Sequence, residues 1–377
     1  MATTFKTFMN NDVVSTRTML HEAIPITGTL LSGTYGTFQS EENIRNFSHG
    51  MFQSIYDYPY LSSSANHIFD ISVGYHSSSG IQLATNDQNN KKMNIYNQFA
   101  QVLVGYDTGS NVKLFDEDGN FSAGGNKLKE CFFVTFSRLL MKDEIKKGSF
   151  NMELGVSGSA QTGYNGFNNA DEFNDRITLK DTGAENDYRV NSPAGEYGIL
   201  YVSNSAGSPL NDVTGSTELA AGLIYYQAGV AVITSSVLMR SGTAGETGGF
   251  LSSSADMTID ANHQSLSGTM QTYAISASAD AIRHRIYNIS FNNTTELNST
   301  IYFCRANHNE FNYSSNPTYL SGSKIFVKEN TLDTPVSYIT TIGLYSADNE
   351  LLAAAKLSEP LKKDPNTELT LRVRLDY

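Results

Sequence analysis

Short alternating apolar runs, separated by turn-forming residues, fill the chain from about residue 151 onward and restrict it to β structure. They include "YGILYVSN", "AGLIYYQAGVAVIT", "STIYFCRAN" and "ELTLRVRLDY", with segments rich in Gly, Ser, Asn and Thr between them. Side chains on a strand alternate between two faces, so each run is expected to bury one face and leave the other wet or docked. In the last run the apolar face is Leu369, Leu371, Val373 and Leu375, and the polar face is Thr370, Arg372, Arg374 and Asp376.

Helical periodicity is confined to the N-terminal third. Apolar residues at helical spacing predict helices over 43–56, 94–105 and 138–147, with Gly105 closing the second. The run "NHIFDISVGY" predicts a strand, and "VKLFDEDGNFSAGG" predicts a hairpin with Asp118 and Gly119 at its tip.

The expected fold class is therefore α+β and mainly β, with antiparallel sheets or sandwich-like domains and a few helices in the N-terminal third. A change in residue composition and apolar periodicity along the 377 residues predicts three regions. These are a mixed α/β domain at 1–150, a β-rich and loop-rich domain at 151–275, and a C-terminal β docking module at 276–377.

Composition excludes some classes of function. The net charge of −12 and the lack of a basic patch argue against direct binding of nucleic acid. No stretch approaches the roughly 20 apolar residues of a membrane-spanning helix, and "MATTFKTFMNND" lacks the pattern of a signal peptide. A soluble protein made in a reducing cytoplasm is expected, with no membrane span.

Motifs for catalysis and cofactor binding are missing. The chain has no GxSxG, phosphate-binding loop or HExxH pattern, and no pair of carboxylates stands out by spacing. We therefore expect no enzyme, no catalytic residues and no cofactor. The acidic tip at 115–120 lacks the final Glu of a calcium loop, and His67 and Asp70 should lie on opposite faces of a strand. A weak surface cation at 168–175 is left open.

The two cysteines, Cys131 and Cys304, lie in apolar strand-like runs and are expected to be buried thiols, although a disulfide between them is left open.

The C-terminal segment carries a likeness to a known class. "EFNYSSNPTYLSGSKIFVKEN" (310–330) and "SYITTIGLYSADNELLAAAKLSEPLKKDPNTELTLRVRLDY" (337–377) resemble structural proteins of contractile-tailed bacteriophages, including large myoviruses and cyanophages. The second stretch is similar to tail-fibre and baseplate proteins with an "IxEIGLYDxxGELIAVAKLP" module. The likeness is looser over the rest of the chain and carries no active site with it.

The resemblance implies a non-enzymatic virion structural protein, assembled in the host cytoplasm. It would be a tail subunit, either baseplate or fibre-attachment adaptor, that docks to other virion proteins and forms a homo-oligomer in a symmetric ring. A neck or collar ring protein and a glycan-binding tail protein with exposed loops at 157–275 are the alternatives. The partner-docking candidates are Arg372, Arg374, Tyr345 and Tyr377, because Arg can pair with a partner's carboxylates and Tyr suits subunit interfaces.

Overall fold

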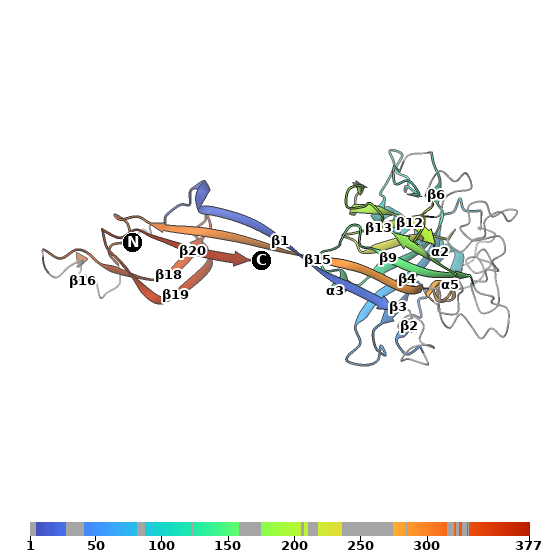
Figure 1. Cartoon of the computed structure of the whole chain (residues 1–377), viewed down its shortest axis with the longest axis horizontal. Helices are drawn as coiled ribbons and strands as arrows, with labels where there is room; N and C mark the ends of the chain where they lie inside the picture. Colours follow the sequence, from blue (N-terminus) through green and yellow to red (C-terminus); the bar gives the residue numbers. More distant parts are fainter. Residues whose placement is uncertain are drawn as a thin grey trace. The chain divides into compact units, whose positions relative to one another are not determined.

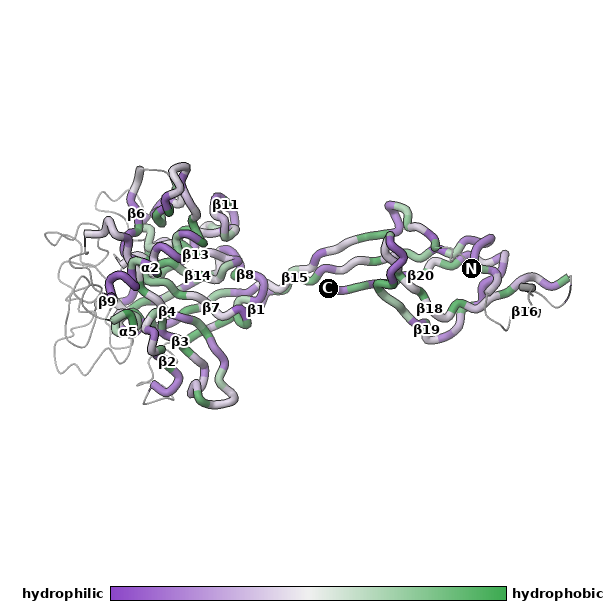
Figure 2. The backbone as a smooth tube through the Cα atoms, turned by 180° about the vertical axis from the view of Figure 1, so that it is seen from behind, coloured by the Kyte–Doolittle hydropathy of each residue, from purple (hydrophilic) through white to green (hydrophobic). Residues whose placement is uncertain are grey.

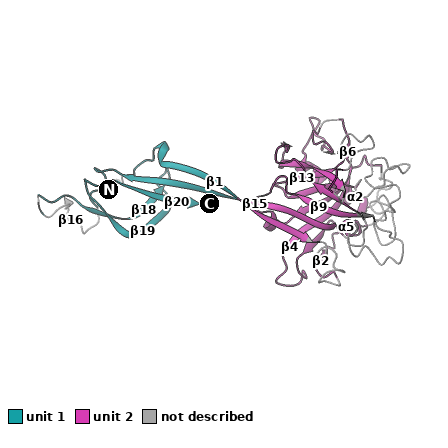
Figure 3. Ribbon diagram, in the orientation of Figure 1, with its two compact units in different colours: residues 1–19, 296–377 teal, residues 20–295 magenta. Residues whose placement is uncertain are grey.

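A computed structural model shows a chain that is mainly β, as predicted (Figure 1). It describes residues 5–27, 41–80, 87–121, 124–157, 175–204, 207–209, 218–235, 274–283, 286–314, 320–321, 324–325, 330 and 332–377. The chain divides into two compact units (Figure 3). Unit 1 contains residues 1–19 and 296–377, and unit 2 contains residues 20–295. This division differs from the three consecutive regions expected from residue composition and periodicity.

Unit 2 is built on a large antiparallel sheet. Its strand order is β15-β9-β10-β12-β13-β14-β7-β4-β3-β2, with β8 also paired to β15 and β11 to β12. The strands are β2 (Ile44–Asn46), β3 (Gln53–Tyr56), β4 (His67–Tyr75), β7 (Glu130–Phe136), β8 (Glu144–Ile145), β9 (Asn151–Ser157), β10 (Asp175–Lys180), β11 (Arg189–Ser192), β12 (Gly195–Asn204), β13 (Ala220–Tyr225), β14 (Val230–Thr234) and the first part of β15 (Ile286–Ala306). A separate small hairpin pairs β5 (Phe115–Asp116) with β6 (Lys127–Leu128), which confirms the predicted hairpin. Its loop spans 117–126, so the prediction that Asp118 and Gly119 form the tip is wrong.

The hydrophobic core lies in unit 2. Every side chain of the main buried cluster falls between Ile26 and Phe291. Strands β13 and β14 are buried along their whole length, so both of their faces are covered. Figure 2 shows the apolar residues concentrated along the strands of this unit.

Helix α2 (Asp87–Leu103) packs on β4 through aromatic and aliphatic side chains, and α5 (Ile275–Arg283) also contacts β4. The Phe99 ring stacks on Phe133 with centroids 4.2 Å apart. The helix predicted over 94–105 is confirmed and begins earlier. Gly105 has φ of +86° and its N–H donates to the Ala100 carbonyl, so it ends the helix as expected.

Two of the predicted helices are wrong in whole or in part. Residues 43–56 form strands β2 and β3, joined by a turn in which Gly50 has φ of +62°. The predicted helix over 138–147 is reduced to α3 (Arg138–Met141) and is followed by β8. Residues 43–56 pair with each other and with the next strand, β4, whereas β8 pairs with β15, about 150 residues away. In both places this strand pairing outweighs the local periodicity.

Unit 1 is assembled from both ends of the described chain. It contains η1 (Asn10–Asp12), the first part of β1 (Val13–Thr27), the second part of β15, and β20 (Leu369–Asp376). β15 lies between β1 and β20, and its pairing with β20 runs from Ser299↔Asp376 to Ala306↔Leu369. A second sheet is the hairpin of β18 (Ser337–Tyr345) and β19 (Leu351–Lys363), and β16 (Leu320–Ser321) pairs with β17 (Lys324–Ile325).

Candidate docking surface

The β18–β19 hairpin is the stretch whose sequence resembles virion modules, and its geometry follows from its residues. The strands pair from Ser337↔Lys363 to Tyr345↔Leu351. The connecting turn is closed by the Ser346 N–H, which donates to the Glu350 carbonyl at 2.9 Å. Asn349 adopts φ of +66°, a conformation that Asn tolerates better than most residues, so Asp348 and Asn349 form a tight turn.

A buried lysine fixes the base of this hairpin. Lys363 is fully buried, and its ammonium donates to the His308 carbonyl at 3.3 Å, to Asn312 Oδ1 at 2.8 Å and to the Asp364 carbonyl at 2.9 Å. Across the pair, the Ser337 hydroxyl donates to the Phe311 carbonyl. Both strand ends are therefore attached to the loop that follows β15.

Few apolar side chains are buried in unit 1. Among its described residues only three hydrophobic side chains are buried, those of Ala306, Leu344 and Val373. The expected apolar stripe of β20 is confirmed as an alternation, but Leu369, Leu371 and Leu375 are only half-buried. The described part of unit 1 therefore lacks the enclosed core that usually stabilises a domain of about 100 residues.

Many large apolar side chains of unit 1 are exposed instead. On the hairpin, Tyr338 is 57% exposed, Tyr345 45%, Leu351 56% and Leu352 68%. Others lie elsewhere in the same unit: Phe5, Phe8, Met9, Val14, Met19, Leu297, Phe311, Tyr313, Leu332 and Tyr377. Single exposed apolar residues are ordinary, but a group on one small unit marks an interaction surface.

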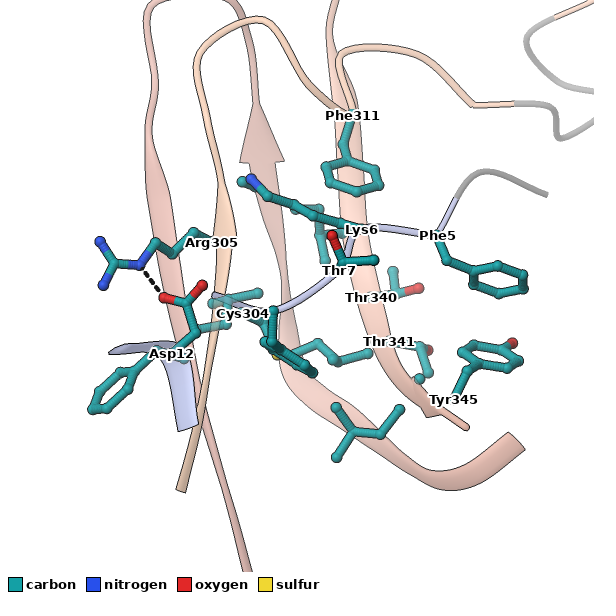
Figure 4. A pocket seen from close by; sticks show the side chains of 18 of the residues that line it. Phe5, Lys6, Thr7, Asp12, Cys304, Arg305, Phe311, Thr340, Thr341 and Tyr345 are labelled. Atoms are coloured by element: carbon teal, nitrogen blue, oxygen red, sulfur yellow. Dashed lines mark hydrogen bonds and ion pairs between the residues drawn. The ribbon is translucent and has the colours of Figure 1, made fainter. Parts of the chain in front are cut away.

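A cavity of about 730 Å³ opens inside unit 1 (Figure 4). Its walls come from residues 5–8, from β15 at Phe303–Ala306 and from the whole of β18. The cavity occupies the place where a closed sandwich would hold its core. Cys304 lines it as a half-buried free thiol, and burial raises the pKa of this thiol.

The segment before β1 is held along the cavity wall by polar and aromatic contacts. The Phe5 and Tyr345 rings lie 4.6 Å apart, and Figure 4 shows them side by side. Asp12 pairs with Arg305 at 2.6 Å, and the pKa of Asp12 is lowered by the Met9 backbone N–H and then by Arg305. Lys6 pairs with Glu310 and lowers the pKa of that carboxyl.

The four predicted docking residues all lie in unit 1. Arg372 is exposed and makes no hydrogen bond or ion pair with any described residue. Arg374 is engaged within the unit, since it donates to Asp376 at 2.7 Å and to Ser299 at 3.0 Å. Tyr345 packs on Phe5, and the Tyr377 hydroxyl lies 3.1 Å from Thr300 Oγ1. Of the two arginines, Arg372 is thus the more available for an ion pair with a partner.

Sequence reasoning missed Phe5, Lys363 and the exposed hairpin leucines. Phe5 contacts Tyr345, about 340 residues away, and Lys363 contacts Asn312, about 50 residues away. Local sequence patterns do not predict such contacts. The exposure of a leucine at 351–352 could have been predicted, because two adjacent leucines on a strand must place one side chain on each face.

The other candidate sites hold no ligand chemistry in the part of the chain that is described. No group of three or more His, Cys, Asp or Glu there could hold a metal ion. The acidic tip at 115–120 has its buried carboxylate, Asp116, paired with Lys127. His67 and Asp70 meet at 2.8 Å, so the expectation that they lie on opposite faces is wrong. Cys131 and Cys304 are free thiols.

Some predictions fall on residues outside the description. The suggested cation loop at 168–175 lies there except for Asp175, as does most of the loop region at 157–275. Within the described ranges, no helix is long and apolar enough to cross a membrane.

Comparison with known proteins gives no relative: no protein-family model, no curated protein and no solved structure matches this chain.

Proposed function

We propose that this chain is a non-enzymatic structural subunit of a bacteriophage virion, a tail component of the baseplate or fibre-attachment type. It docks to neighbouring virion subunits through unit 1. The observation that carries the proposal is the open state of unit 1. Its described residues bury three hydrophobic side chains and leave a cavity where a core would be. A subunit that completes its core only against a neighbour suits a permanent assembly.

Two further features support the proposal. The hairpin that projects the exposed apolar residues belongs to the same stretch that resembles tail-fibre and baseplate modules. The described residues also bring together no cluster of metal-ligating side chains, and the strongly shifted acids and tyrosines are buried structural groups.

The test is the location of the protein in purified particles. Particles from a phage that encodes this chain are expected to contain it in stoichiometric amount, and antibody labelling should place it on the tail. Labelling at the neck would reject the tail assignment, and absence from washed particles would reject the virion role.

A charge reversal tests the docking surface in the same system. Arg372→Glu is expected to reduce incorporation into particles several-fold, because a carboxylate replaces the free cation facing the partner. Lys180→Glu is the control, since Lys180 is an exposed strand cation of unit 2. Equal incorporation of both variants would show that Arg372 is only a solvated surface residue.

A further inference from the structure

We infer that unit 1 is a self-association module: a second copy of this chain covers the exposed face of the β18–β19 hairpin. The inference concerns the chain in isolation, so it stands or falls separately from the virion role.

The first argument is the contrast in burial between the two units. Unit 2 holds the whole of the main hydrophobic cluster and is complete by itself. Unit 1 has three buried hydrophobic residues among its described residues, while its strands and the segment before them expose at least ten large apolar side chains. Among the described residues, exposed large apolar side chains are therefore much denser on unit 1, which has fourteen, than on the larger unit 2, which has eight.

The second argument is the arrangement of the exposed face. Directly opposed residues on paired strands lie on the same face of the hairpin. One face carries Ile339, Ile342 and Leu344 with their partners on β19, and these are half-buried or buried. On the other side Tyr338 and Tyr345 are exposed, and Leu351 lies opposite Tyr345.

Gly343 is covered on this face by its neighbours Tyr345 and Leu351. It has no side chain, and a Cβ there would lie 2.9 Å from the Tyr345 ring and 3.2 Å from Leu351 Cδ1. The two apolar side chains therefore lie over the glycine, and the Phe5 ring packs beside Tyr345. An exposed apolar face of this kind can be covered by the same face of another copy, as in a two-fold contact.

The third argument is charge, which favours a copy over an oppositely charged partner. Unit 1 contains ten Lys and Arg and eleven Asp and Glu, so its net charge is −1. The remaining −11 of the total −12 therefore falls on unit 2. Two copies of unit 1 meet without net repulsion, whereas copies of unit 2 repel each other.

Unpaired strand edges extend the same surface. Within the described residues β18 pairs only with β19, and β20 pairs only with β15. Each of these strands therefore offers one edge of backbone N–H and C=O groups, which a strand of a second copy can satisfy.

The test uses the full chain and its mass in solution. Sedimentation velocity over a hundredfold range of concentration is expected to give a multiple of the 41.3 kDa chain mass. The double variant Tyr338→Glu/Leu351→Glu should weaken self-association at least tenfold and shift the chain to the monomer. The control Leu61→Glu/Val190→Glu changes two exposed apolar residues of unit 2 and should associate like the wild type.

A second measurement keeps the inference testable if the double variant loses the hairpin. A photo-crosslinking amino acid at position 351 should yield covalent dimers, while the same amino acid at position 61 should not. A wild-type chain that stays monomeric at every concentration would overturn the inference. So would a double variant that folds and associates normally, or an equal yield of dimers from positions 351 and 61.

Discussion

Gly74 is the residue at which the main helix meets the main sheet. A Cβ at this position of β4 would lie 2.8 Å from the Lys92 carbonyl oxygen and 2.8 Å from the Tyr96 backbone nitrogen. Both are backbone atoms of α2, so they cannot rotate away as a flexible side chain would. The absence of a side chain therefore sets how closely α2 approaches β4.

The substitution Gly74→Ala is expected to lower the free energy of unfolding by about 1–3 kcal/mol, the usual cost of overpacking. Chemical denaturation of the purified chain measures it. Gly80→Ala is the matched control, since no atom lies within 4 Å of its added Cβ. Equal stability of the two variants would show that α2 can shift to make room.

Asp181 is a buried carboxylate that serves structure. It accepts hydrogen bonds from the Gly148 N–H at 2.7 Å, the Phe150 N–H at 3.0 Å and the Tyr226 hydroxyl at 3.0 Å. Burial raises the pKa of Asp181 to about 6, and the three donors oppose that rise only in part. The folded chain therefore holds this proton more tightly than the unfolded chain, in which the pKa is near 3.8.

The stability from protonated Asp181 is thus fully present below about pH 4 and is lost as the pH rises through about 6, by up to about 3 kcal/mol. We expect the free energy of unfolding of the wild type to fall relative to that of Asp181→Asn between pH 4.5 and pH 7, because the variant cannot titrate there. Denaturation curves of both proteins across this range measure the difference. Parallel pH profiles would place the pKa of Asp181 at its ordinary value.

At the scale of elements, the hairpins were easier to predict than the helices. The hairpin of β5 and β6 and the alternation of β20 follow from local chemistry, and both are found. The false helix over 43–56 arose because Ile44, Phe47 and Ile55 also fit a helical spacing. Gly50, in the middle of that segment, was the available signal against it.

The prediction at the scale of elements concerns Lys363, which anchors the base of the β18–β19 hairpin. Lys363→Met keeps the length of the side chain but leaves three acceptors without their donor in a buried site, which costs about 1–3 kcal/mol. We expect hydrogen exchange of β18 to speed up while exchange in β13 and β14 stays unchanged. The control is Lys362→Met, whose side chain is exposed; if both variants exchange alike, the buried ammonium does not hold the hairpin.

At the scale of the whole molecule, the β class could be predicted and the division into units could not. Period-two patterns are local, so strands such as β12 and β20 were visible in the sequence. Unit 1 instead depends on contacts such as Asp12 with Arg305, which lie 293 residues apart. The candidate surface was found in part, because Tyr345 and Arg372 sit within a recognisable strand, whereas Phe5 reaches it from the other end of the chain.

The two units should also differ in how their protection depends on concentration. Amide protons of β13 and β14 are expected to exchange slowly at every concentration, since these strands are wholly buried. Protection of β18 and β19 should rise with protein concentration as copies cover the hairpin. Mass-spectrometric hydrogen exchange at two concentrations measures this, and protection of β18 that is high and constant would show that unit 1 is already complete as a monomer.

The split origin of unit 1 fixes an order of events during synthesis. Strand β1 leaves the ribosome early, but its neighbour in unit 1 begins at Glu296, after all of unit 2 has been translated. At about 5–20 residues per second, that interval is roughly 15–60 s, long enough for unit 2 to fold first. Unit 1 therefore completes its sheet only after the residues of unit 2 have been translated. The order of the sequence itself thus delays the hairpin surface until unit 2 is present.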